Sequence, residues 1–114
     1  LAMHAGASEL AKPHARRNLA AFGDDVDAIV TNAAGCGSGM HEYPLLFAGE
    51  PEQERAQRFA ARVLDVSVFL DRLGLREPPP LARPLTVAYQ DACHLAHAQG
   101  VRDAPRALLR AIEA

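Results

Sequence analysis

Two short apolar runs, each followed by a cysteine, constrain the fold of this chain most strongly. "DAIVT" at residues 27–31 precedes Cys36, which lies in the glycine-rich stretch "NAAGCGSGM". "LTVAY" at residues 85–89 precedes Cys93, in "DACHLAHAQG". Short apolar runs of this kind are typical of buried strands in parallel sheets. We predict two parallel strands with both cysteines at one edge of the sheet and no disulfide between them, because sites in open α/β sheets gather at the carboxyl ends of the strands.

Helical patterns surround both runs. In "PHARRNLAAFG" the residues Ala15, Leu19 and Phe22 share one helix face, and Gly23 is a natural C-cap. The helix begins either at Pro13 or at Ser8 with Pro13 as a kink, and the sequence leaves both alternatives open.

The longest helical signal covers residues 50–75, "EPEQERAQRFAARVLDVSVFLDRLGL". Asp65 or Ser67 is a candidate cap for a second helix within it. The proline-containing stretch "REPPPLARP" reads as a linker, and the amphipathic "APRALLRAIEA" predicts a final helix with Leu108, Leu109 and Ile112 facing inward.

The order helix, strand, helices, strand, helix predicts an α/β fold: a small parallel sheet with helices packed against it. The 114 residues fit one domain, 1–114, and 49% hydrophobic residues suffice for a core. The positions expected to be buried are Leu19, Phe22, Ile29, Phe59, Val63, Leu70 and Val87.

Composition excludes several function classes. With 23% charged residues and a net charge of −2, the chain lacks the basic character of a nucleic-acid binder, so we expect no nucleic acid as partner. No apolar run approaches the roughly 20 residues that span a bilayer. Two cysteines beside glycine or histidine do not form a disulfide framework, which favours a reducing compartment such as the cytoplasm.

The cysteines allow two interpretations. Gly35 and Gly37 let the backbone turn closely around Cys36, and a helix N-terminus favours the thiolate, the form that binds metal. Equally, each cysteine fits a buried small hydrophobe in a plain α/β interaction domain.

Histidines add a further option. Cys36, Cys93, His94 and His97 would make four zinc ligands by count, but their spacing matches no zinc pattern. We expect the side chains of Cys93 and His94 to diverge, because neighbours in sequence point apart in helices and strands. His4, His14 and His41 are expected at the surface.

Longer motifs carry a family resemblance. "VTNAAGCGSGMHEYPLLF", "FAARVLDVSVFL" and "VAYQDACHLAHAQGVRDAPRALLRAI" resemble the CCG cysteine-rich family, and within it the iron–sulfur subunits of glycolate oxidase. Heterodisulfide reductase B subunits and lactate-utilisation proteins are related members. The family motif has Cys-Cys-Gly, then about thirty-five residues, then Cys-x-x-Cys, and it usually occurs twice.

The resemblance assigns a place to each cysteine. Cys36 matches the first cysteine of Cys-x-x-Cys, and Gly39 stands where the second is expected. Cys93 matches the opening cysteine of the second repeat, with "DAC" in place of Asp-Pro-Cys and Gln90 where histidine is common. The chain then corresponds to an internal fragment between the two Cys-Cys-Gly motifs. Cys36 and Cys93 would be iron–sulfur ligands in the longer parent protein only, supported by Gly35, Gly37 and His94.

The resemblance also implies a function. The parent subunit would carry an iron–sulfur cluster such as 4Fe–4S, accept electrons from a flavin-containing partner that oxidises glycolate, and pass them to a membrane acceptor. This implies a cytoplasmic location, peripheral to the inner face of the membrane. The fragment alone is expected to be inactive and to hold no cluster. Lactate utilisation and glycerol-3-phosphate dehydrogenation are alternatives within the family, and a non-catalytic interaction domain is an alternative outside it.

Overall fold

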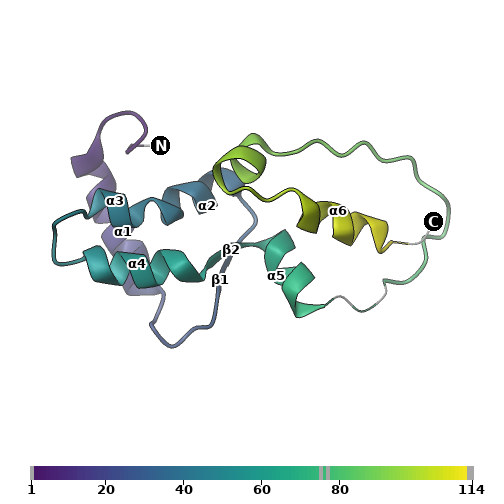
Figure 1. The fold of residues 1–114 in the computed structure, drawn as a ribbon, viewed down its shortest axis with the longest axis horizontal. Coiled ribbons are helices and arrows are strands. Elements are labelled where there is room, and N and C mark those ends of the chain that lie inside the picture. Colours follow the sequence, from purple (N-terminus) through teal and green to yellow (C-terminus); the bar gives the residue numbers. More distant parts are fainter. Residues whose placement is uncertain (1, 75, 77, 113–114) are drawn as a thin grey trace.

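Two three-residue strands hold the middle of the molecule together (Figure 1). In the computed structural model, which describes residues 2–74, 76 and 78–112, β1 (Ile29–Thr31) pairs in parallel with β2 (Val63–Asp65). The register joins Ile29 to Val63 and Thr31 to Asp65. Helices pack around this pair, so the predicted α/β class with a small parallel sheet is confirmed.

The main core lies between the sheet and the helices on one side of it. There α1 (Ser8–Ala21), α3 (Tyr43–Leu46) and α4 (Gln53–Arg62) come together. Helix α1 begins at Ser8 with Pro13 inside, which decides between the two alternatives left by the sequence. The buried cluster joins residues from all of these elements: Ala15, Leu19, Ile29, Leu46, Phe47, Ala56, Phe59 and Val63.

One predicted core residue of this half is only partly covered. Phe22 is 41% exposed, because α1 already ends at Ala21 and Phe22 is its extended C-cap, one residue before the predicted cap Gly23. Its ring still meets Phe59 edge to face at 5.9 Å.

The second half begins where β2 leads directly into α5 (Val66–Leu73). The Asp65 carboxylate caps α5 by accepting a hydrogen bond from the Ser67 amide at 2.9 Å, so the predicted cap is confirmed. The strand before it was not expected, because residues 63–65 lie inside the longest helical pattern.

Helix α5 packs against α6 (Asp103–Arg110), while α2 (Ala34–His41) packs against β2 and the π-helix η1 (His94–Ala98). The predicted final helix is present, but its inward face is smaller than expected. Leu109 is 39% exposed and Ile112 is 40% exposed.

The predicted strand at residues 85–89 is wrong. No strand is assigned there, every residue from 81 to 90 is exposed, and Val87 is 67% exposed. A strand needs a neighbouring strand to pair with its backbone N–H and C=O groups. In the described part of the chain the sheet consists of β1 and β2, so β1 pairs with β2 and not with residues 85–89. The segment instead arches away from the body between α5 and η1, which Figure 1 shows in green.

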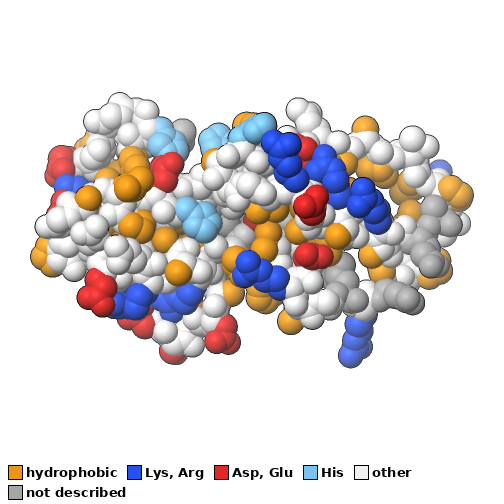
Figure 2. All heavy atoms as spheres, in the orientation of Figure 1, with side chains coloured by type: hydrophobic (Ala, Val, Ile, Leu, Met, Phe, Trp, Pro, Cys, Tyr) orange, Lys and Arg blue, Asp and Glu red, His pale blue; other side chains and the backbone are white. Residues whose placement is uncertain are grey.

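The molecule is consequently elongated. Its radius of gyration is 16.9 Å and its extents are 53 × 31 × 19 Å, whereas a compact domain of this length has a radius of about 13 Å. Figure 2 shows charged side chains of both signs side by side along the surface. Among the described residues, no helix is long and apolar enough to cross a bilayer.

Candidate thiol site

Cys36 lies at the carboxyl end of β1, as predicted. The chain leaves the strand at Thr31, whose hydroxyl accepts a hydrogen bond from the Ala33 amide at 3.2 Å, and α2 begins one residue later. Cys36 is the third residue of this helix and its side chain is exposed.

Cys93 reaches the site by a different route from the one predicted. No strand precedes it; instead it directly precedes η1, and it is exposed. Its sulfur lies 3.6 Å from Nδ1 of His94, so the expectation that these neighbouring side chains diverge is wrong. Cys93 is the αR residue directly before η1, and π-helical turns are frequent at functional sites.

The turn of η1 is closed by backbone geometry that only glycine adopts readily. The Gln99 amide donates to the His94 carbonyl at 3.1 Å, and the Val101 amide donates to the Leu95 carbonyl at 2.9 Å. Between them Gly100 has a φ of 68°, in the left-handed region.

Side-chain hydrogen bonds join η1 to α2. The Gln99 side-chain amide donates to the Ala34 carbonyl at 2.9 Å, and the Ser38 hydroxyl donates to the His94 carbonyl at 3.5 Å. The two cysteines, 57 residues apart in sequence (93 minus 36), therefore sit on packed segments. Both are free thiols.

A cavity of about 740 Å³ opens beside Cys36, and His94 lines it from the opposite segment. Its walls come from α1, α2, α3 and the N-terminal residues, and they are mostly apolar, with Met3, Met40 and Tyr43 among them. Burial raises the pKa of Tyr43, the nearby Cys36 raises it further, and a hydrogen bond from Asn18 opposes the shift. His4 and Glu42 form a pair on the wall, at 2.6 Å.

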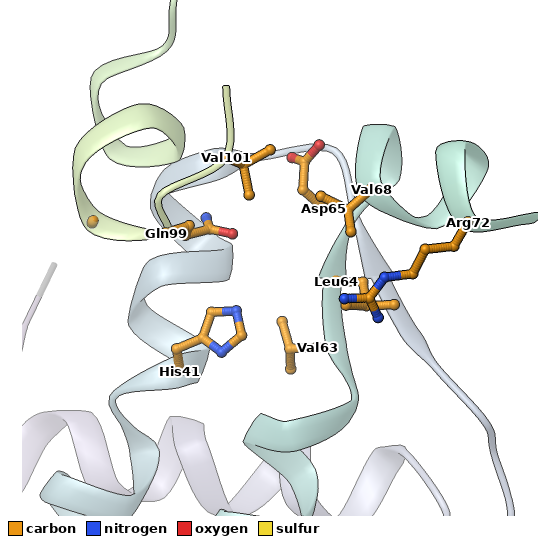
Figure 3. A pocket seen from close by; sticks show the side chains of 9 residues that line it. His41, Val63, Leu64, Asp65, Val68, Arg72, Gln99 and Val101 are labelled. Atoms are coloured by element: carbon orange, nitrogen blue, oxygen red, sulfur yellow. The ribbon is translucent and has the colours of Figure 1, made fainter. Parts of the chain in front are cut away.

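Of the remaining histidines, His4 and His14 line the cavity beside Cys36, whereas His41 and His97 do not. His97 contacts Arg102, with 3.3 Å between Nδ1 and the guanidinium. His41 lines a separate cavity of about 310 Å³ with Asp65, Arg72 and Gln99, and Figure 3 shows no cysteine among its labelled residues. His4, His14 and His41 are exposed, as predicted. Over the described residues, no group of three or more histidine, cysteine and acidic side chains is placed to hold a metal, so the four-residue zinc set is not assembled.

Two further contributors, Gln99 and Arg106, could not be identified from sequence patterns. Gln99 connects the cysteine-bearing segments, yet in the sequence it is only a polar residue before a glycine. Arg106 forms a two-pronged pair with Asp91, each contact 2.8 Å long, and stacks over Tyr89 at 5.4 Å. The guanidinium lowers the pKa of Asp91. This ion pair holds the residues just before Cys93 against α6. Its two partners are fifteen residues apart in sequence, a separation that no local sequence pattern reveals.

Comparisons with known proteins show which families the chain is similar to. Residues 1–41, which include Cys36, match the family model of the CCG cysteine-rich domain. The chain is 40% identical to a probable glycolate oxidase iron–sulfur subunit of Bacillus subtilis over 96% of its own length and 26% of that relative. It is 32% identical to lactate utilization protein A of Geobacillus kaustophilus over 98% of its length and 47% of that relative.

A third relative is an uncharacterized iron–sulfur protein of Methanococcus maripaludis, 32% identical over 94% of this chain and 19% of that protein. No solved structure matches the chain. The chain thus spans between a fifth and a half of the length of these relatives. Its resemblance to the CCG cysteine-rich family, to a glycolate oxidase iron–sulfur subunit and to lactate utilization protein A is confirmed.

Proposed function

We propose that this chain is a cluster-bearing segment of an electron-transfer subunit, and that Cys36 and Cys93 each supply a thiolate to an iron–sulfur cluster. The observation that carries the proposal is the placement of two free, exposed thiols on packed segments, each at the start of a helix. In an interaction domain with structural cysteines, both thiols would be buried in the core, whereas here both are exposed. Thiolates are the soft ligands that such clusters select.

The donor set fits the cluster in kind but not in number. Clusters of this type are held by about four cysteine thiolates, and the chain has two cysteines. The described residues add no cluster of metal-ligating side chains that would complete the set. We therefore place the remaining thiolates outside these 114 residues, in a longer polypeptide, and expect the chain by itself to hold no stable cluster.

When bound, the cluster supplies one-electron transfer. The chain's own residues would hold and shield it: Cys36 and Cys93 provide sulfur, His94 stands 3.6 Å from the Cys93 sulfur, and the apolar cavity beside Cys36 limits water on one side. Near the thiols the described residues include one imidazole–carboxylate pair, His4 with Glu42 on the cavity wall. We propose that the 2-hydroxy acid is oxidised in a flavin-containing partner subunit, with a membrane acceptor downstream.

Iron binding tests the thiolate role. The longer polypeptide is purified anaerobically, reconstituted with iron and sulfide, and assayed for iron, labile sulfide and visible absorbance. Cys36→Ser and Cys93→Ser should each lose iron, whereas Ala20→Ser, at an exposed position of α1, should keep it. Full iron retention by both cysteine variants would refute the assignment. Stoichiometric iron on the 114-residue chain would show that the donor set is complete without further segments.

Substrate choice needs a separate measurement. The reconstituted subunit is mixed with its co-purifying flavoprotein, and bleaching of the visible absorbance is followed after addition of glycolate or lactate. Identity favours glycolate, at 40% against 32%, so glycolate should reduce the cluster faster. Faster reduction of the cluster by lactate would instead assign the subunit to lactate utilisation.

A further inference from the structure

We propose that Gln99 is the positioning residue that fixes the spacing of the two thiols. The significance of this role rests on the proposed function, in which both thiols are ligands. Gln99 is half-buried and directly precedes the left-handed Gly100. Figure 3 shows its side chain extending from the η1 segment toward the start of α2.

Gln99 holds two backbones at once. Its main-chain amide donates to the His94 carbonyl at 3.1 Å, which closes the turn that begins after Cys93. Its side-chain amide donates to the Ala34 carbonyl at 2.9 Å, in the turn of α2 that carries Cys36. A single residue thus connects the turn next to one thiol with the turn next to the other.

Ser38 completes the connection. It is 4% exposed, and its hydroxyl lies 3.4 Å from the Gln99 side-chain nitrogen and 3.5 Å from the His94 carbonyl. Gly37 leaves space for the Gln99 side chain, since a Cβ on Gly37 would lie 2.9 Å from the Gln99 side-chain nitrogen. In this arrangement of α2 against η1, the Gln99 side-chain nitrogen and the Ser38 hydroxyl both have hydrogen-bond partners.

This connection matters because the sheet does not position Cys93. Cys36 follows β1 in the chain, but residues 81–90 before Cys93 are exposed and form no strand. The approach is anchored at Asp91 by Arg106, which belongs to α6 and does not reach α2. The Gln99 side chain, at 2.9 Å from the Ala34 carbonyl, makes the shorter of the two hydrogen-bonded links between the Cys93 segment and the helix that carries Cys36, and the Ser38–His94 hydrogen bond at 3.5 Å is the other.

Thiol crosslinking tests the proposal without iron. The chain is treated with a series of bis-maleimides of increasing span, and the Cys36–Cys93 crosslink is quantified by peptide mass spectrometry. The wild-type chain should give a sharp maximum at one span. Gln99→Met keeps the length and packing of the side chain but removes the donor, so its yield at that span should fall roughly fivefold, the population change expected for one hydrogen bond.

Two controls separate positioning from a loss of structure. Gln57→Met, at an exposed position of α4, should leave the crosslink unchanged. The rate of single-site alkylation of each thiol and the helical circular dichroism of Gln99→Met should match the wild type, because both thiols are already exposed. A crosslink profile of Gln99→Met identical to that of the wild type would overturn the proposal. A lower crosslink yield accompanied by a proportional loss of helical circular dichroism would also overturn it. Loss of iron ligation would leave this result intact, so the two proposals can fail separately.

Discussion

Gly37 is the glycine in the cysteine-bearing turn whose missing side chain the packing requires. It is buried in α2, and a Cβ there would lie 2.9 Å from the Gln99 side-chain nitrogen and 3.2 Å from the Thr31 methyl. Gly37→Ala should lower the free energy of unfolding by about 1–2 kcal/mol, since overpacking outweighs the gain in helix propensity. Urea unfolding followed by circular dichroism measures the change.

Gly39 provides the matched control. It lies in the same helix, and nothing stands within 4 Å of the Cβ that alanine would add. Gly39→Ala should therefore raise the free energy of unfolding by about 0.4–1 kcal/mol. Equal effects at the two positions would mean that α2 is not held against Gln99.

Phe59 is the aromatic centre of the core. It is 1% exposed, stacks on Tyr43 at 5.5 Å and meets Phe22 at 5.9 Å. Phe59→Ala should cost about 3–5 kcal/mol of unfolding free energy, because a large cavity would form under α1 and α3. Leu10→Ala, at a side chain 68% exposed, should change stability by less than about 0.5 kcal/mol in the same thermal or urea unfolding assay. Similar losses for the two variants would contradict this core.

Single residues could be predicted where a short-range pattern decides their environment. Leu19 and Phe59 are buried as expected, because each lies on the apolar face of its helix. Ile29 and Val63 are buried as well, although Val63 belongs to β2 and not to the helix whose period predicted it. Val87 is exposed although its run is just as apolar, since burial there depends on a partner that the pattern does not specify.

At the scale of elements, Asp65 decides where β2 becomes α5. It is 6% exposed, and its carboxylate accepts hydrogen bonds from both the amide and the hydroxyl of Ser67. Asp65→Ala should cost about 0.5–2 kcal/mol of unfolding free energy, the typical value of an N-cap. Asp65→Asn keeps an acceptor oxygen and should lose much less. Equal losses for both variants in urea unfolding would show that the charge, and not the cap, matters.

The pair between Asp91 and Arg106 gives α6 a pH dependence. The guanidinium holds the pKa of Asp91 below its ordinary value of 3.8. A lowered pKa in the folded state stabilises the fold at pH values above the ordinary one, and this stabilisation is lost as the pH falls through the folded value. Asp91→Asn should therefore melt below the wild type at pH 7, and the difference in Tm should shrink below about pH 3.8.

A charge-removal control accompanies that measurement. Asp71 is exposed on α5, so Asp71→Asn removes one carboxylate at a helical surface position. Its Tm difference from the wild type should be smaller at pH 7 and should not shrink in the same way on acidification. A constant Tm difference for Asp91→Asn across this pH range would mean that the pair does not form in solution.

The elements themselves were predictable when they were long or capped. Helices α1 and α4 follow clear apolar periods, and the cap at Asp65 was visible in the sequence. Strand β2 was not predictable, because its three residues lie between two helices and continue their helical spacing of apolar residues. Pairing with β1 is what makes these residues extended. For the site, the two cysteines and His94 were identifiable from motifs, whereas Gln99 and Arg106 act across distances that local patterns do not encode.

At the scale of the whole molecule, the core is concentrated at one end and the rest is loosely built. The buried cluster joins α1, α3, α4 and the sheet, while α5, η1 and α6 contribute few buried side chains. Leu85, Val87 and Tyr89 are exposed on a segment that arches between α5 and η1 (Figure 1). The long dimension of 53 Å follows from this arrangement.

The last prediction separates the two interpretations of residues 85–89. If the segment is exposed, as the structure describes, Val87→Lys should change the free energy of unfolding by less than about 0.5 kcal/mol. Val63→Lys, at a side chain 1% exposed, buries an unpaired charge and should cost at least about 4 kcal/mol or prevent folding. Hydrogen exchange supplies an independent measurement: the amides of 85–89 should exchange quickly, while those of β1 and β2 are protected. A large loss for Val87→Lys together with slow exchange in its segment would restore the strand that the sequence predicted and move it into the core.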